Sequence, residues 1–187
     1  SAPAELSNTG LVRALESPDS WWRELARRLL IERGAAETVD AIERVAAESP
    51  RPEARVQALW ALQGIGRLRT EVIEIASRDA SAGVREQAVM LAGRRLAGDS
   101  RFGPMLVRAA SDADARVRFC AALELGSWTD ERAVSPLATI ALRDGADRWT
   151  RAAVFSGVSG RLEGFRTAVA AGRTGAPAAV VAPVMEE

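Results

Sequence analysis

The chain has 187 residues, 25 of them acidic and 25 basic, so its formal net charge is zero. Neutrality argues against a nucleic-acid partner, because such proteins normally carry a net basic surface. Hydrophobic residues make up 48% and aromatic residues only 5%, which favours closely packed helices over sheets. The absence of histidine and the single Cys120 exclude histidine-based zinc, haem and general-base sites and an internal disulfide. We therefore expect an all-α protein with no catalytic residue, metal site or cofactor, in which Cys120 is a buried structural thiol.

Neither a membrane span nor a leader is recognisable in the sequence. No run of about 18 apolar residues and no charged-then-apolar leader is present, so we expect no direct membrane insertion. The chain begins at Ser1 rather than at a methionine, which suggests a processed protein or a segment excised from a longer one. In isolation we expect a monomer.

An arginine-bearing segment recurs five times. Each copy ends on an alanine, and these alanines lie 32, 30, 33 and 32 residues apart at positions 26, 58, 88, 121 and 153. A period of this length is typical of a solenoid, in which each short unit is buried only by its neighbours.

Turns rich in Asp, Ser and Pro precede five predicted helices, which we call the B helices, because these residues suit helix N-termini. The B helices are expected at 19–33, 52–64, 82–97, 114–126 and 147–158. Shorter A helices are expected at Leu11 to Glu16 and near 36–48, 70–78, 101–111, 131–143 and 161–171. Glycine is expected to end several B helices, at Gly34, 64–66, Gly98, Gly126 and 157–160.

Short loops between A and B helices predict antiparallel pairs that stack side by side. We expect an α-solenoid of about five pairs in a right-handed superhelical stack over residues 1–171. The predicted repeats span 8–34, 35–66, 67–98, 99–126 and 127–160, with a partial sixth from 161. Residues 172–187 are either a truncated repeat helix, which we favour, or a flexible tail.

Each B helix has an anchor residue and an alanine four positions later on one stripe that faces the core. The expected anchors are Trp22, Ala54, Val84, Val117 and Trp149. The arginines beside them are candidate partner-binding residues: Arg23, Arg55, Arg85, Arg118 and Arg151. They either line a groove for an anionic ligand or pair with acidic residues of the same or the adjacent repeat, such as Asp19, Glu53, Glu86 and Asp114. We favour the pairing.

Trp21 is a further candidate partner-binding residue, because it adjoins the anchor Trp22 but points about 100° away from it on a helix. It either packs as a lid under Leu11 and Leu15 or presents an exposed aromatic contact. We favour the lid. Trp60, Trp128 and Trp149 are expected in the core.

The segment from Asp114 to Gly126, with its turn aspartate, Val-Arg, Ala-Ala and Leu-Gly, resembles HEAT repeats of the short bacterial type shared with phycobilin-lyase-like proteins. Pro18 to Gly34 resembles the opening HEAT repeat of planctomycete-type membrane-bound dehydrogenase-like proteins, which join a β-propeller, a HEAT segment and a c-type cytochrome domain. That resemblance implies an armadillo-type solenoid between two redox modules at the cell envelope or in the periplasm. Without it, the cytoplasm is the expected location. None of the family's haem or catalytic residues has a counterpart here.

The sequence thus predicts a non-catalytic scaffold or protein-interaction module, whose partner is another protein or the flanking domains of the same chain. The alternative is a HEAT-fold enzyme or ligand binder. A phycobilin-lyase-like protein would need a pocket for a tetrapyrrole. A DNA-glycosylase-like protein, the weaker alternative at zero net charge, would need a basic groove with an exposed tryptophan and a catalytic aspartate.

Overall fold

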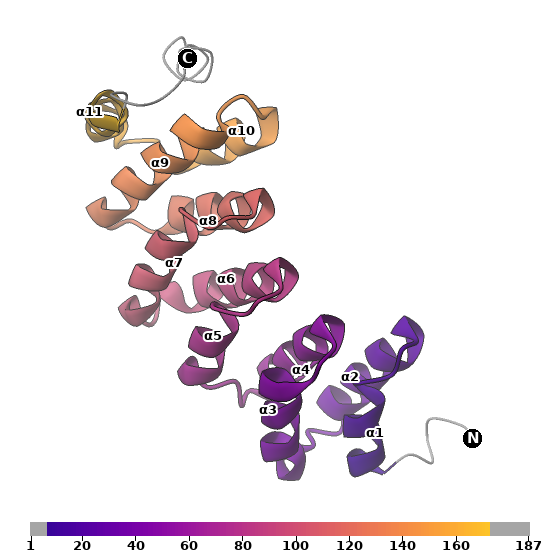
Figure 1. Ribbon diagram of the computed structural model, residues 1–187. Coiled ribbons are helices and arrows are strands. Elements are labelled where there is room, and N and C mark those ends of the chain that lie inside the picture. Colours follow the sequence, from indigo (N-terminus) through magenta and orange to yellow (C-terminus); the bar gives the residue numbers. More distant parts are fainter. Residues whose placement is uncertain (1–6, 173–187) are drawn as a thin grey trace. The chain divides into compact units, whose positions relative to one another are not determined.

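A computed structural model describes residues 7–172, which form eleven α-helices, three short 3₁₀ helices and no strand (Figure 1). The helices are α1 (Asn8–Ala14), α2 (Ser20–Glu32), α3 (Val39–Glu48), α4 (Pro52–Ile65), α5 (Thr70–Ala76), α6 (Ala82–Leu96), α7 (Gly103–Ala109), α8 (Ala115–Ser127), α9 (Val134–Asp144), α10 (Arg148–Gly157) and α11 (Leu162–Gly172). The 3₁₀ helices η2 (Ala36–Thr38), η3 (Ser100–Phe102) and η4 (Glu131–Ala133) lead into α3, α7 and α9. The predicted all-α fold is confirmed.

The ends of the helices follow from their capping residues. Each end of the five predicted B helices lies within one residue of an end of α2, α4, α6, α8 or α10. Asp19, Asp114 and Asp147 accept hydrogen bonds from the first-turn amides of α2, α8 and α10, respectively, and Pro52 opens α4. The leading helix differs from its prediction: α1 begins at Asn8 and ends at Ala14, because the Ser7 side chain caps its first turn. The predicted alternatives for the last segment, 173–187, lie outside the described residues.

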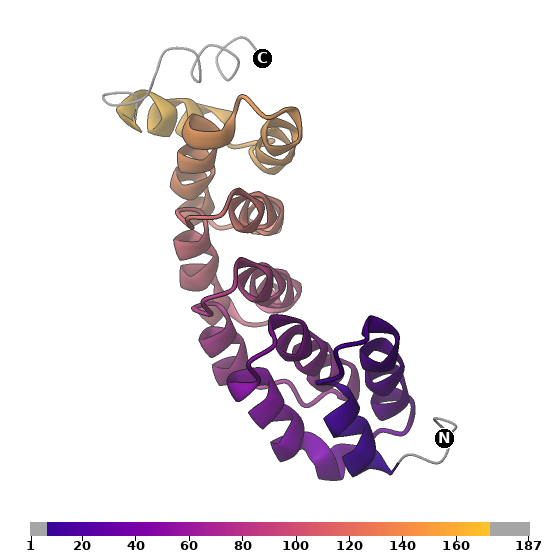
Figure 2. The ribbon, with the colours of Figure 1, turned by 45° about the vertical axis from the view of Figure 1, so that its right-hand side comes forward.

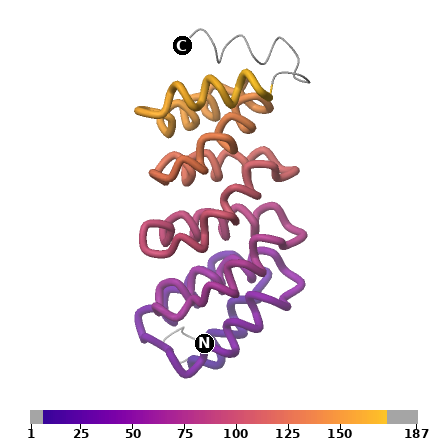
Figure 3. The backbone as a smooth tube through the Cα atoms, turned by 90° about the vertical axis from the view of Figure 1, so that its left-hand side faces the viewer, coloured from indigo at the N-terminus to yellow at the C-terminus, as the bar shows by residue number. Residues whose placement is uncertain are grey.

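The chain divides within α6 into two compact units, Ser1–Ala88 and Val89–Glu187. In the first unit α1 packs on α2 and α3, α2 packs on α4, and α3 packs on α4 and α5. Figure 2 shows α3 and α5 in one layer and α2 and α4 in the other, and Figure 3 follows the short connections between them. The core of this unit lies between the layers and includes Leu11, Leu15, Leu30, Ile42, Leu59, Leu62 and Ile73, all fully buried.

The second unit repeats the same layered arrangement. The helix α8 packs on α7, α9 and α10, and α9 packs in addition on α10 and α11. Its fully buried residues include Leu91, Phe102, Leu106, Leu125, Leu137 and Phe165. The aliphatic composition predicted this kind of core.

Glycines end helices at only some of the expected places. Gly34, Gly66 and Gly160 have positive φ angles of 58°, 75° and 81°, a left-handed conformation that glycine adopts at little cost. Gly126 instead lies inside α8, directly against Gly157 at the end of α10. A Cβ atom on Gly126 would lie 3.0 Å from the Gly157 Cα atom. This glycine is needed for the close contact of two helices rather than to stop one.

Candidate functional site

The five recurring arginines share one contact with the backbone. In each copy Nη1 donates a hydrogen bond of 2.6–2.8 Å to the carbonyl oxygen six residues earlier in the chain. The donors are Arg23, Arg55, Arg85, Arg118 and Arg151, and the acceptors are Ser17, Ser49, Asp79, Asp112 and Gly145. Each arginine therefore closes the turn that leads into its own B helix. We name this contact the arginine–turn contact.

Arg55 and Arg118 also form part-buried ion pairs within their unit. Arg55 binds both carboxylate oxygens of Asp79 at 2.7 Å, and Arg118 binds both oxygens of Asp144 at 2.6 Å. The Asp144 carboxylate raises the pKa of Arg118, although burial opposes this shift. Both arginines thus pair with an acidic residue, which agrees with the pairing that we favoured. Their partners lie 24 and 26 residues away, after the following A helix, and are not the neighbouring acids that we named.

The arginine–turn contact corrects the alignment of the fifth copy. Counted on the arginines, the intervals are 32, 30, 33 and 33 residues, and the anchor position falls on Thr150 rather than Trp149. Thr150 is 6% exposed, whereas Trp149 is 62% exposed. The predictions of Trp149 as an anchor and as a core residue are therefore wrong. Its counterpart in the first copy is Trp21, two positions before the arginine, and not Trp22.

Trp21 is exposed rather than packed as a lid. Its side chain is 56% exposed, while Leu11 and Leu15 are fully buried without it. Its ring meets the edge of the Trp22 ring at a centroid distance of 4.9 Å. The cap at Asp19 fixes the start of α2, and consecutive residues leave the helix about 100° apart, so Trp21 is more exposed than Trp22. The lid hypothesis is wrong, and the exposed aromatic contact remains.

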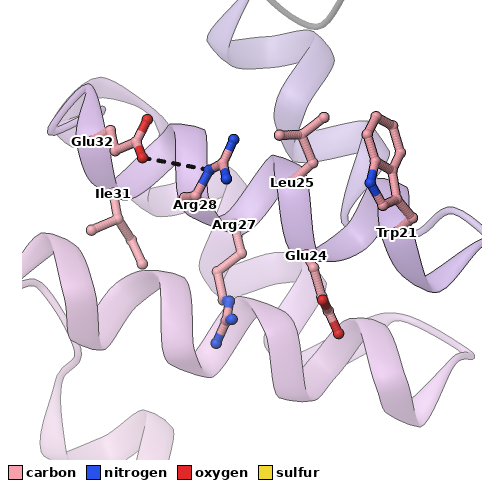
Figure 4. Close-up of a pocket in the computed structure, with 7 residues that line it drawn as sticks. All are labelled: Trp21, Glu24, Leu25, Arg27, Arg28, Ile31 and Glu32. Atoms are coloured by element: carbon pink, nitrogen blue, oxygen red, sulfur yellow. Dashed lines mark ion pairs between the residues drawn. The ribbon is translucent and has the colours of Figure 1, made fainter.

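An open cavity of about 570 Å³ lies on this face of α2 (Figure 4). Its lining forms two rows at helical spacing, which we call the α2 face. The first row holds Trp21, Leu25, Arg28 and Glu32, and the second holds Glu24, Arg27 and Ile31. Figure 4 shows the two rows pointing to opposite sides of the helix. Ile31 lies against Gly64 of α4, so the second row is turned toward that helix.

The two arginines of the α2 face have different surroundings. Arg28 is mostly exposed and forms a 3.5 Å ion pair with Glu32 one turn later, a kind of pair worth about 0.3–0.5 kcal/mol. In contrast, the Nε atom of Arg27 is buried, and no acceptor for it exists in the described part of the chain. A buried donor without an acceptor costs free energy until a ligand supplies one. Arg27 thus lines the cavity as the cationic group of this face whose Nε atom has no acceptor within the described residues.

The described residues offer little for other chemistry. Within residues 7–172 no three His, Cys, Asp or Glu side chains are grouped so that they could hold a metal ion. Over the same range, no helix has both the length and the apolar character that crossing a bilayer requires. Cys120 is buried, as predicted.

Comparison with known proteins agrees with this architecture. Residues 69–158 match the family described as HEAT repeats. Among solved structures, a designed armadillo repeat protein in complex with the peptide (KR)4 superposes with a TM-score of 0.53 at 19% identity, over 97% of this chain and 98% of that one. No curated protein matches the chain. Residues 69–158 are therefore similar to HEAT repeats, and the fold of the chain is an all-α, armadillo-like repeat solenoid.

Proposed function

We propose that this chain is a non-catalytic scaffold that binds a protein partner through the α2 face. The observation that carries the proposal is that an exposed tryptophan, Trp21, and an arginine whose buried Nε atom has no acceptor, Arg27, line one cavity. HEAT repeats usually serve as non-catalytic interaction surfaces, which supports the general assignment.

The chemistry of the α2 face indicates what a partner must offer. Trp21 and Leu25 form an apolar strip, and tryptophan is enriched among residues that dominate binding energy at interfaces. Arg27 needs an acceptor, and a carboxylate satisfies arginine better than a neutral oxygen does. A partner segment with an apolar side chain next to an acidic residue meets both needs. The designed armadillo protein, whose peptide is (KR)4, supports binding of an extended peptide by such a repeat surface.

The recurring arginines, which were candidate partner-binding residues, have a supporting role in this proposal. Arg118 is only 5% exposed, and Arg55 is held by Asp79. We assign Arg23, Arg85 and Arg151 to the same role because each makes the arginine–turn contact. Contact with the partner is then left to the α2 face.

The test is affinity capture from an extract of the cells that encode the chain, followed by titration of the purified captured protein. Trp21→Ala and Arg27→Gln are each expected to weaken binding at least about tenfold. Ile75→Ala, at an exposed apolar residue of α5, is the matched control and should bind as the wild type does. Equal binding by all three variants would exclude the α2 face. Turnover of a substrate by the purified chain would exclude a purely non-catalytic role.

A narrower proposal concerns the parent protein. The resemblance of Pro18 to Gly34 to the HEAT segment of membrane-bound dehydrogenase-like proteins supports a solenoid that joins two redox modules, and this rests on sequence resemblance alone. The full reading frame tests it. A propeller upstream and a haem-attachment motif downstream are the expected result, and a frame without them would leave a stand-alone HEAT protein.

A further inference from the structure

Trp149, the counterpart of Trp21 in the fifth copy, borders a separate cavity within the second unit. This cavity measures about 670 Å³ and lies between the start of α8 and the α9–α10 turn. Its lining includes Arg116, Phe119, Arg143, Asp144, Asp147 and Trp149. The Trp149 ring is 62% exposed, and together with Phe119 it gives the cavity an aromatic wall.

The carboxylates at this cavity are already occupied by the protein itself. Asp144 is held by two hydrogen bonds from Arg118. Asp147 accepts from the Trp149 and Thr150 amides and from the Thr150 hydroxyl, and the Thr150 amide in particular lowers the pKa of its carboxyl group. Asp114 caps α8 and lies beside Arg116. These acids therefore hold the backbone and the arginines in place rather than facing a ligand.

Two exposed arginines remain largely uncompensated: Arg143 lines the cavity, and Arg148 lies against the Trp149 ring that borders it. The guanidinium of Arg148 stacks on the Trp149 ring at 4.4 Å from its centroid, and no hydrogen bond or ion pair to it occurs within residues 7–172. Stacking uses the flat face of the guanidinium and leaves its in-plane N–H donors available. Arg143 makes one long bond of 3.4 Å to the Asp112 carbonyl. The cavity thus combines an aromatic wall with one exposed cationic group in its lining, Arg143, and a second, Arg148, on the Trp149 ring at its border.

From this charge arrangement we propose that the cavity binds an acidic segment of a protein partner, in which aliphatic side chains alternate with carboxylates. The aliphatic groups would cover Trp149 and Phe119, and the carboxylates would pair with Arg143 and Arg148. The inference rests on the proposed scaffold function and adds a second contact site with a stated ligand chemistry. A basic segment such as (KR)4 would be repelled here.

The experiment uses the full chain and a short fluorescein-labelled peptide of alternating leucine and glutamate, followed by fluorescence anisotropy at low salt. Matched peptides carry glutamine or lysine in place of glutamate. The glutamate peptide is expected to bind at least about tenfold more tightly than either. Raising the salt concentration should weaken its binding, because exposed charges are screened.

Variants locate the site on the chain. Trp149→Ala and the double variant Arg143→Gln/Arg148→Gln should each bind the glutamate peptide about tenfold more weakly. These variants are made in the Trp21→Ala background, so that the α2 face does not contribute, and are compared with that parent. Ile75→Ala, at an exposed residue of α5 outside both cavities, is the matched control and should bind as the parent does. All five positions are exposed, and circular dichroism checks that the helices are kept. The inference would be overturned if Trp149→Ala and the double variant both kept the parent affinity for the glutamate peptide. It would also be overturned if the lysine peptide bound equally well, or if no peptide bound. The scaffold proposal is tested separately, by whether the captured partner protein binds the Trp21→Ala variant more weakly than the wild type.

Discussion

Glu124 is a carboxylate at a position where the other B helices have apolar residues or glycine. The equivalent residues, six positions after each recurring arginine, are Leu29, Ala61, Leu91 and Gly157. Glu124 fits because Gly93 of α6 has no side chain: a Cβ atom there would collide with the Glu124 carboxylate. Burial raises the pKa of Glu124, and the charge of Arg94 opposes this shift.

We expect Glu124→Gln to stabilise the protein at neutral pH. A raised pKa means that the folded state binds the Glu124 proton more strongly than the unfolded state does. The contribution of this group is therefore most favourable below its unfolded-state pKa and is lost as the pH rises through its folded-state pKa. Chemical denaturation from pH 4 to 8 should show the largest gain from Glu124→Gln at the high end. Glu74→Gln, at an exposed glutamate of α5, is the control. A gain that does not change with pH would contradict the explanation.

The Arg118–Asp144 pair provides a second prediction for a single residue. Asp144→Asn leaves the mostly buried guanidinium of Arg118 without its counter-charge, and we expect a loss of about 2–4 kcal/mol in the free energy of unfolding. Arg28→Gln breaks an exposed pair and should cost less than about 0.5 kcal/mol. Urea denaturation measures both. Similar small losses in the two variants would show that the buried pair is not a structural tie.

Among the elements, α8 and α10 depend on the close approach of Gly126 and Gly157. A Cβ atom on Gly157 would overlap the Gly126 backbone, which cannot move aside as a flexible side chain can. We therefore expect Gly157→Ala to destabilise the protein by about 1–3 kcal/mol, despite the better helix propensity of alanine. In α11, a Cβ on Gly164 would lie 3.7 Å from the nearest Val134 atom, an ordinary contact. Thermal unfolding should show Gly164→Ala to be neutral or stabilising, and equal effects of the two changes would refute the packing argument.

The elements also show how far sequence alone could go. The bounds of the B helices were predictable because Asp19, Asp114, Asp147 and Pro52 mark helix entries by local chemistry. The fifth copy was misaligned because Ala153 resembles the repeated alanine, and only the arginine–turn contact fixes the register. The partner Asp79 follows the next A helix, and Asp144 is the last residue of α9, so their identity depends on how helices stack. The exposure of Trp21 depends on which sides of α2 are covered by neighbouring helices. A local sequence pattern does not contain that information.

At the scale of the whole molecule, the division into two compact units predicts that a core substitution destabilises mainly the unit that carries it. Residues in a repeat protein contact mainly their neighbours, so damage should spread little beyond its surroundings. Leu59→Ala in the first unit and Leu137→Ala in the second each remove a fully buried side chain, at an expected local cost of about 2–5 kcal/mol. Hydrogen exchange should show faster amide exchange mainly in the unit that carries the change. Equal loss of protection in both units would indicate one cooperative structure.

The arginine–turn contact has a consequence for how such a chain grows during evolution. The arginine and the carbonyl that it binds lie only six residues apart. A single short stretch of the gene therefore encodes all the residues that form one turn and its contact. An in-frame duplication of about one period therefore copies a turn together with its arginine–turn contact. Where an Arg–Asp pair links two turns, the new junction must supply only one carboxylate at the right place. The number of repeats can therefore change without redesign of the turns, and selection is left free to act on exposed positions such as Trp21 and Trp149.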